Sequence, residues 1–188
     1  ATAFVPIFTD ELSASKEEAK KAAASVLSFT IALTLLLSAL GIWFSPEITD
    51  IFAPGFATIQ NKRELASSLM RVMFPYIVFV SVLALVSGML NSLGHFALPA
   101  AAPALLNIVL IAGLFLLTPF FREPIYGLAW AVLLGGVASV IPQFVLLRKL
   151  GFPLRLSSPF HSPAVRKLIL LMLPAILSSS VYHLMVFF

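Results

Sequence analysis

The chain has 188 residues, of which 60% are hydrophobic and 11% are charged, and its formal net charge is +4. A soluble domain usually has about 25% charged residues, and a chain of this length cannot bury so much apolar surface in a core of its own. The composition therefore excludes a soluble domain. The absence of cysteine excludes disulfides and thiol chemistry, and the dispersed basic residues give no reason to expect a nucleic-acid partner.

Long apolar runs separated by short polar breaks make up most of the sequence. A hydrocarbon core about 30 Å thick requires about 20 apolar residues in a helix, whereas a strand has only about five or six residues. The chain is therefore predicted to be all-α, a polytopic transmembrane helical bundle. Its membrane-crossing segments are predicted, in chain order, as the end of a helix at 1–12 and helices at 22–45, 66–92, 97–118, 125–147 and 165–188.

Three polar segments separate some of these helices. Residues 13–21 are predicted to be a cytoplasmic loop, in which Ser15 and Glu18 fit a capping box for the next helix. The first complete helix is followed by a periplasmic amphipathic segment and loop at 46–64. A basic cytoplasmic loop is predicted at 148–164, before the last helix.

The expected orientation follows from the distribution of lysine and arginine. Positive residues mark the cytoplasmic side of a membrane protein, which indicates a multi-pass protein of the bacterial inner membrane with the richer side in the cytoplasm. The eight basic residues of that side are Lys16, Lys20, Lys21, Arg148, Lys149, Arg155, Arg166 and Lys167. The opposite side has Lys62, Arg63 and Arg122.

Small residues recur every fourth position in the predicted helix at 125–147, at Gly127, Ala131, Gly135 and Ser139, and Gln143 continues the row. Small residues at this spacing let two helix backbones approach closely. Helix packing is the simpler interpretation of the row. A cavity wall that slides is the functional alternative, and Gln143 is a candidate cavity-lining residue.

Prolines and polar residues inside the predicted spans are the other candidates for function. Asn107 follows two prolines at a spacing of four residues and lies deep in the membrane, where an amide requires a partner or a cavity. Interhelical hydrogen bonding and contact with substrate or water both stay open for Asn107 and for Gln143. The prolines expected to bend helices are Pro75, Pro99, Pro103 and Pro174.

The last predicted helix contains two further candidates, Ser180 and His183. His183 is the only histidine inside a predicted span. A proton-linked switch and a packed, hydrogen-bonded histidine are both consistent with this position. Ser180 lies one turn before it and is a second candidate cavity-lining residue.

The sequence contains no recognisable catalytic set. Its eight acidic residues lie in predicted loops or at interfaces, and it has no HExxH, GxSxG, Walker A or GxGxxG motif. We therefore expect neither an enzyme nor a bound metal or cofactor. Uncharged spans rich in glycine and proline fit a transporter better, because transporter helices rock or bend.

An ordered set of short motifs resembles the MurJ/MviN family of lipid II flippases across nearly all of the chain. Any one of these motifs is weak, but their order and spacing are specific. They are AFVPIF at 3–8, APGF at 53–56, FPY at 74–76, LNS at 90–92, FALPA at 96–100, LLNI at 105–108, LAWA at 128–131, GG at 135–136 and LPA at 173–175.

The resemblance implies the fold of the multidrug/oligosaccharidyl-lipid/polysaccharide exporter superfamily, in which two helical lobes face each other across a cavity. The chain would be a fragment from the end of the second helix to the seventh. The implied function is to move lipid II between leaflets by alternating access, with lipid II, membrane lipids and the rest of the transporter chain as partners. Another exporter of the superfamily for polysaccharide-lipids or drugs, and a non-transporting scaffold of cell-wall synthesis, are the alternatives.

Overall fold

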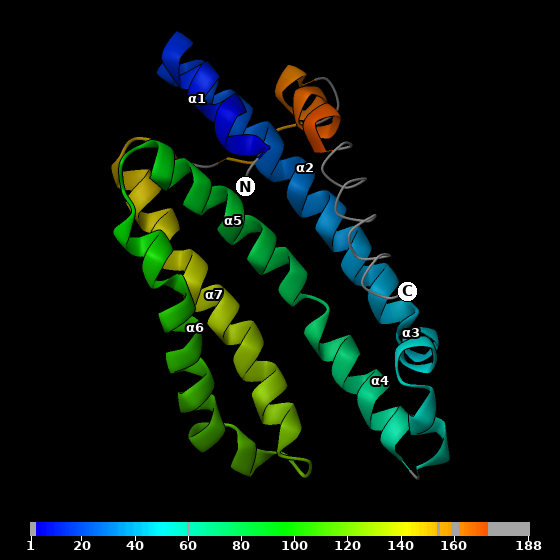
Figure 1. Cartoon of the computed structure of the whole chain (residues 1–188). Coiled ribbons are helices and arrows are strands. Elements are labelled where there is room, and N and C mark those ends of the chain that lie inside the picture. The colour runs from blue at the N-terminus through cyan, green and yellow to red at the C-terminus, as the bar shows by residue number, and fades with distance from the viewer. Residues whose placement is uncertain (1–2, 60, 154, 159–161, 173–188) are drawn as a thin grey trace, which may run out of the picture.

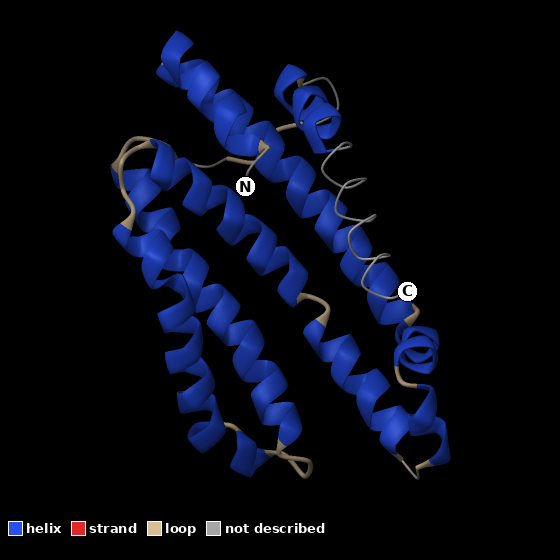
Figure 2. Ribbon diagram, in the orientation of Figure 1, coloured by secondary structure: helices blue, strands red, loops and turns tan. Residues whose placement is uncertain are grey.

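The computed structural model describes residues 3–59, 61–153, 155–158 and 162–172. Within these ranges the chain forms helices and loops and no strand (Figure 2). The elements are α1 (Phe4–Ala14), α2 (Lys16–Trp43), α3 (Ser45–Phe52), η1 (Pro54–Thr58), α4 (Lys62–Met73), α5 (Tyr76–Ser92), α6 (Ala97–Leu116), η2 (Thr118–Phe120), α7 (Ile125–Lys149) and a helical segment at 163–172 (Figure 1).

Four stretches are long and apolar enough to cross a membrane: Lys16–Trp43, Lys62–Ser92, Ala97–Leu116 and Ile125–Lys149. Most of their residues are not buried inside the protein, and large apolar side chains such as Leu36 and Phe115 point outward. Water cannot solvate so much apolar surface, whereas lipid can. The prediction of an all-α transmembrane bundle is confirmed.

Nearly all of the predicted loop at 13–21 is helical, which corrects that prediction. Ser15 alone separates α1 from α2, and its Oγ accepts a hydrogen bond of 3.1 Å from the Glu18 amide. Glu17 and Glu18 lie in the first turn of α2, where they complement the positive end of the helix. Polar residues that favour a helix and carry their own cap extend α2 beyond its apolar part.

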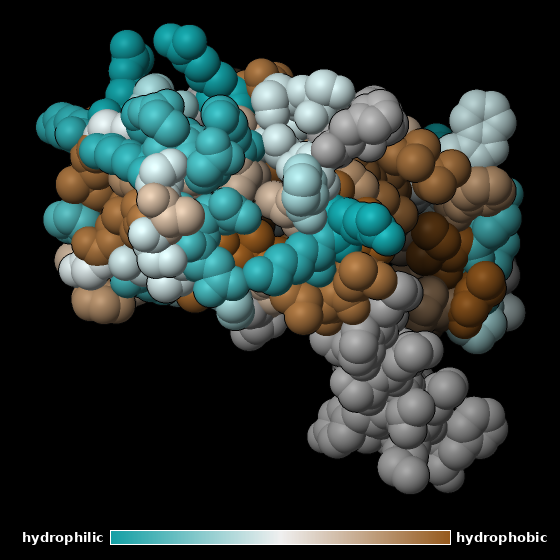
Figure 3. All heavy atoms as spheres, turned by 90° about the horizontal axis from the view of Figure 1, so that it is seen from above, coloured by the Kyte–Doolittle hydropathy of each residue, from teal (hydrophilic) through white to brown (hydrophobic). Residues whose placement is uncertain are grey.

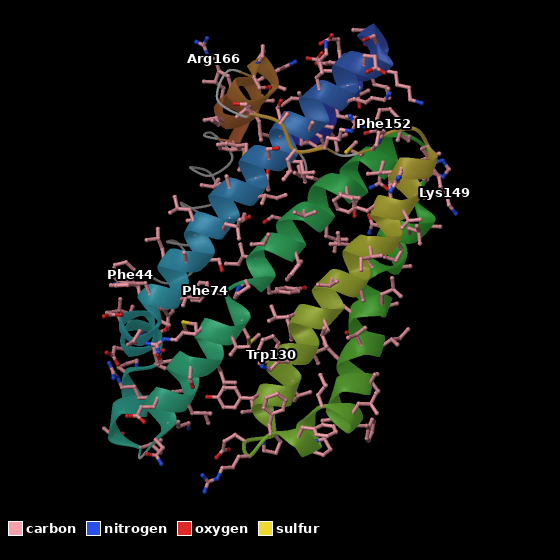
Figure 4. The ribbon with its side chains drawn as sticks, turned by 180° about the vertical axis from the view of Figure 1, so that it is seen from behind. Phe44, Phe74, Trp130, Lys149, Phe152 and Arg166 are labelled. Atoms are coloured by element: carbon pink, nitrogen blue, oxygen red, sulfur yellow. The ribbon has the colours of Figure 1, made fainter. Side chains whose placement is uncertain are left out.

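The predicted helix at 66–92 is divided into α4 and α5. Pro75 has no N–H to donate to the carbonyl of Arg71, and the helix ends before it, at Met73. The Phe74 ring lies at this break, on the side of α2, where it packs directly against Gly41 (Figure 4). The absence of a side chain at Gly41 makes room for the ring.

The helices form two groups that share α5. The hydrophobic core lies between α1, α2, α5, the second half of α7, the loop after it and the segment at 163–172. Helix α6 packs along α7 on the other side of the molecule (Figure 1). The loop after α7 contributes Phe152, whose ring meets Phe8 of α1 at 5.7 Å between centroids. Other fully buried core side chains are Phe4, Ile7, Val26, Val86, Met89, Leu90 and Leu147.

Polar residues concentrate at the end of the bundle that contains α1, the start of α2 and the loop after α7. Viewed from that end, hydrophilic side chains gather over the surface, and hydrophobic ones lie along the sides (Figure 3). The opposite end has α3, whose Ser45 and Thr49 are buried while Ile51 and Phe52 are exposed. A helix on the surface of a soluble protein buries its apolar side chains and exposes its polar ones, so the opposite pattern in α3 fits an interfacial segment.

Candidate functional site

A groove lies between α5 and α6, with α7 as its floor. The two helices meet at their connecting turn and diverge from it, each packed against α7 (Figure 1). The groove has a volume of about 320 Å³. Its main lining residues are Phe79, Leu83 and Ser87 of α5, Pro99, Pro103 and Leu106 of α6, and Gly136 and Ser139 of α7.

Small residues of α7 set how close its neighbours come. A Cβ atom at Gly127 would lie 2.7 Å from the backbone of Thr118, and one at Gly135 would lie 2.5 Å from Leu106. Ser139 donates a hydrogen bond of 3.2 Å to the Ala102 carbonyl of α6. The predicted row of small residues is therefore a packing seam that runs from η2 at Gly127 along α6 as far as Ser139.

Gln143 continues that row but bonds to α5. Its side chain is only 1% exposed, and its Oε1 accepts a hydrogen bond of 2.8 Å from the hydroxyl of Ser87. Among the described residues its Nε2 has no hydrogen-bond partner. Burying an amide N–H without an acceptor costs free energy. A further acceptor next to Gln143 Nε2, beside the groove, would therefore be stabilised.

Asn107 lies elsewhere. It is exposed on α6, and no side-chain hydrogen bond involves it in the part of the chain that the structure describes. Pro99 and Pro103 line the groove, but Asn107 is not among its lining residues. Each step of four residues turns a helix by about 40° beyond a full turn, so eight residues rotate Asn107 by about 80°.

The remaining candidates are placed as follows. Pro103 lies inside α6, and Pro99 lies in its first turn. Pro174, Ser180 and His183 lie outside the described residues. No group of three metal-ligating side chains occurs within the described ranges.

Sequence reasoning missed Ser87 and Pro142. Ser87 is a polar residue in an otherwise apolar run, and its partner is apparent only once α5 and α7 are side by side. Pro142 lies inside α7 and leaves the carbonyl of Ala138 without its usual helical donor. For Pro142, the available signal was a proline deep inside the predicted helix at 125–147.

The loop after α7 is fixed to α2 by polar contacts. The Lys16 ammonium donates to the carbonyl of Leu150 at 3.0 Å, and the Ser157 amide donates to Ser28 Oγ at 2.9 Å. An ion pair of 2.8 Å between Lys167 and Asp10 joins the segment at 163–172 to α1. Figure 4 shows Phe152 of this loop beside the end of α7 and Arg166 on the 163–172 segment.

The family model described as "Lipid II flippase MurJ" matches residues 1–188, the whole chain. The chain belongs to the lipid II flippase MurJ family. It is 37% identical over 187 residues to the lipid II flippase MurJ of Burkholderia cenocepacia, which covers 97% of this chain and 36% of the relative. The match to the probable lipid II flippase MurJ of Rhizobium tropici is 36% identical and covers 95% of this chain and 34% of the relative.

A third member of the MurJ family, the probable lipid II flippase of Buchnera aphidicola subsp. Schizaphis graminum, is 40% identical and covers 78% of this chain and 29% of the relative. The chain thus spans about a third of the length of the relatives it matches. These MurJ relatives are named as flippases, which are transporters rather than enzymes. The family resemblance found in the sequence is confirmed.

Proposed function

We propose that the protein is a lipid II flippase of the bacterial inner membrane, which moves the lipid-linked peptidoglycan precursor from the inner to the outer leaflet by alternating access. The observation that carries this proposal is the family match over every residue of the chain. Four apolar helices of membrane-spanning length support it. Lipid II, membrane lipids and the rest of the transporter are its partners.

The proposed orientation places the ends of α1 and α2 around Ser15 and the loop after α7 in the cytoplasm. The richer set of basic residues lies at this end, as the rule of positive charge predicts. The opposite end, with α3 and the start of α4, then faces the periplasm. This orientation makes the α4 segment the outer half of its span and α5 the inner half.

Alternating access requires elements that move between two packings, and the breaks in the helices suggest where. The outer segment α4 can change its angle to α5 at Pro75, because a proline leaves no backbone hydrogen bond to break there. The α6–α7 pair is joined by close backbone contacts and would move as a unit. The groove between α5 and α6 then opens or closes as α5 shifts against that unit.

Within this mechanism Gln143 and Ser87 are the polar groups that a shift of α5 would expose to water or substrate. Asn107, Ser180 and His183 are further proposed cavity-lining residues. Cysteine substitution at Gln143 and Asn107, followed by a water-soluble thiol reagent, tests this. Labelling supports a wet cavity, and protection at both positions supports packing.

The function is tested with the full-length protein in cells depleted of their own flippase. Growth and the exposure of lipid II at the outer leaflet are both measured. Rescue with exposure is the expected result. Normal membrane insertion without rescue would contradict the proposal and favour another exporter of the superfamily or a scaffold.

A further inference from the structure

A second cavity lies at the opposite end of the molecule from the basic loop, between the start of α4 and the start of α7. It has a volume of about 720 Å³. Lys62, Glu64, Arg71 and Glu123 line it, and all four are exposed, so the cavity is open. Its remaining lining residues are Ile59, Asn61, Arg63, Leu65, Ser67, Ser68 and Tyr126.

Arg71 forms the inner end of this cavity. Its Nε donates a hydrogen bond of 2.8 Å to Ser45 Oγ, which is fully buried and lies 3.3 Å from Ser67 Oγ. The hydroxyls orient the guanidinium but do not neutralise it. The described ion pairs of the chain do not include Arg71. Its terminal N–H groups therefore remain available for an anion, which a guanidinium binds through two hydrogen bonds.

The rim of the cavity has the opposite charge. Arg63 pairs with Asp50 through contacts of 2.5 and 2.6 Å, so these two charges cancel. Lys62 lies over the Phe56 ring at 4.5 Å and balances one carboxylate. Glu64 and Glu123 are in no ion pair among the described residues, and together they leave the rim with one net negative charge.

The two charges are ordered along one face of α4. Glu64, Ser68 and Arg71 are spaced four and three residues apart, so they form a line from the outer end inward. Seven residues of helix separate the Cα atoms of Glu64 and Arg71 by about 10 Å, which leaves room for a ligand with a hydrogen bond of about 2.8 Å at each end. Ser68 bonds the Tyr126 hydroxyl at the middle of this line and fixes the opposite wall.

We propose that this cavity binds the headgroup of a zwitterionic phospholipid with a primary ammonium group, phosphatidylethanolamine, from the outer leaflet. Its phosphodiester, with one negative charge, lies against Arg71. Its ammonium, with one positive charge, lies outward against Glu64 and Glu123. Phospholipids of the outer leaflet have the same order, with the phosphate nearer the hydrocarbon and the ammonium nearer water. The site is separate from the groove and does not depend on the flippase activity.

Charge and hydrogen-bonding capacity distinguish this ligand from its competitors. An anionic phosphatidylglycerol satisfies Arg71 but leaves the acidic rim without a cation. Phosphatidylcholine has the right charges, but its methylated ammonium has no N–H to donate to the carboxylates. A diphosphate carries more negative charge than Arg71 alone balances, and the acidic rim repels the excess.

The test uses the full-length protein, purified in mild detergent and exposed to an equimolar mixture of phosphatidylethanolamine, phosphatidylglycerol and phosphatidylcholine, with retained lipid measured by native mass spectrometry. Phosphatidylethanolamine is expected to exceed each competitor by about tenfold, the size of one charge-assisted hydrogen bond. Equal retention of the three lipids would overturn the proposal. Complete displacement by soluble glycerophosphoethanolamine would overturn the assignment to a bilayer lipid.

Substitutions identify the cavity as the place of binding. Arg71→Gln is expected to lower the retention of phosphatidylethanolamine by about tenfold. The matched control is Arg122→Gln, because Arg122 is an exposed arginine at the same end that does not line the cavity. Equal retention by these two variants would contradict the proposal.

A rim variant keeps the proposal testable if Arg71→Gln fails to fold. The double substitution Glu64→Gln, Glu123→Gln changes the net charge of the rim from negative to positive. Preference is then expected to shift from phosphatidylethanolamine to phosphatidylglycerol. An unchanged preference would show that the rim does not recognise the ammonium, and the proposal would be wrong.

Discussion

The interface between α6 and α7 differs from the junction between α4 and α5, although both pairs are adjacent in sequence. In the first, glycine and alanine bring two backbones together, so that Ala131 contacts Gly113 directly. In the second, Pro75 interrupts one span and the Phe74 ring fills the break. Small residues therefore let α6 and α7 pack as a rigid pair, whereas a proline divides one membrane span into the two segments α4 and α5.

The close contact at Gly127 is the strongest test of the rigid pair. Gly127→Leu places a side chain against the backbone of Thr118, which cannot rotate away, and is expected to destabilise the full-length protein by about 3 kcal/mol. Thermal unfolding in detergent measures the change. Gly55→Leu is the matched control, because a Cβ there meets nothing within 4 Å. Equal Tm values for the two variants would show that the seam is not tightly packed.

The break at Pro75 is tested by restoring the missing N–H. Pro75→Ala allows a hydrogen bond to the Arg71 carbonyl and is expected to leave stability unchanged or to raise it by up to about 2 kcal/mol. Lipid II exposure in depleted cells is expected to fall, because a continuous helix no longer bends there. Pro54→Ala, in the interfacial η1, should keep normal transport. Full transport by Pro75→Ala would show that α4 and α5 do not move against each other.

The contact between Ser87 and Gln143 joins the rigid pair to α5. Ser87→Ala removes the only donor to Gln143 Oε1 in the described residues and is expected to destabilise the protein by about 1.5 kcal/mol. The double variant Ser87→Ala, Gln143→Met removes both polar groups and should recover most of that loss. If both variants keep a normal Tm, water must hydrate the Gln143 amide, as would be the case in a water-filled cavity.

The sequence predicts the helices well because a span must be apolar throughout its length. It also predicts the seam on α7, since a spacing of four residues turns the row from Gly127 to Ser139 only slowly around the helix. It does not predict the partner of Gln143, because that depends on how α5 lies across α7. Asn107 lies outside the groove lined by Pro99 and Pro103 because the rotation of a helix accumulates over two turns, and its role stays a prediction. The loop predicted at 13–21 is wrong because charged residues also favour helices.

The smallest expected effect concerns the ion pair that holds α3 against the start of α4, the helix that precedes the break at Pro75. The Arg63 guanidinium, bonded to Asp50, lowers the pKa of that carboxyl below its ordinary value of 3.8. A lowered pKa in the folded state means that the pair stabilises the protein fully above the ordinary value and loses this effect as the pH falls through the folded pKa. Because the pair is exposed, its contribution to stability is small.

We expect the Tm of Asp50→Asn to lie slightly below that of the unsubstituted protein at pH 7, and the difference between the two Tm values to disappear below about pH 4. A difference that persists at low pH would mean that Asp50 acts through packing and not through its charge.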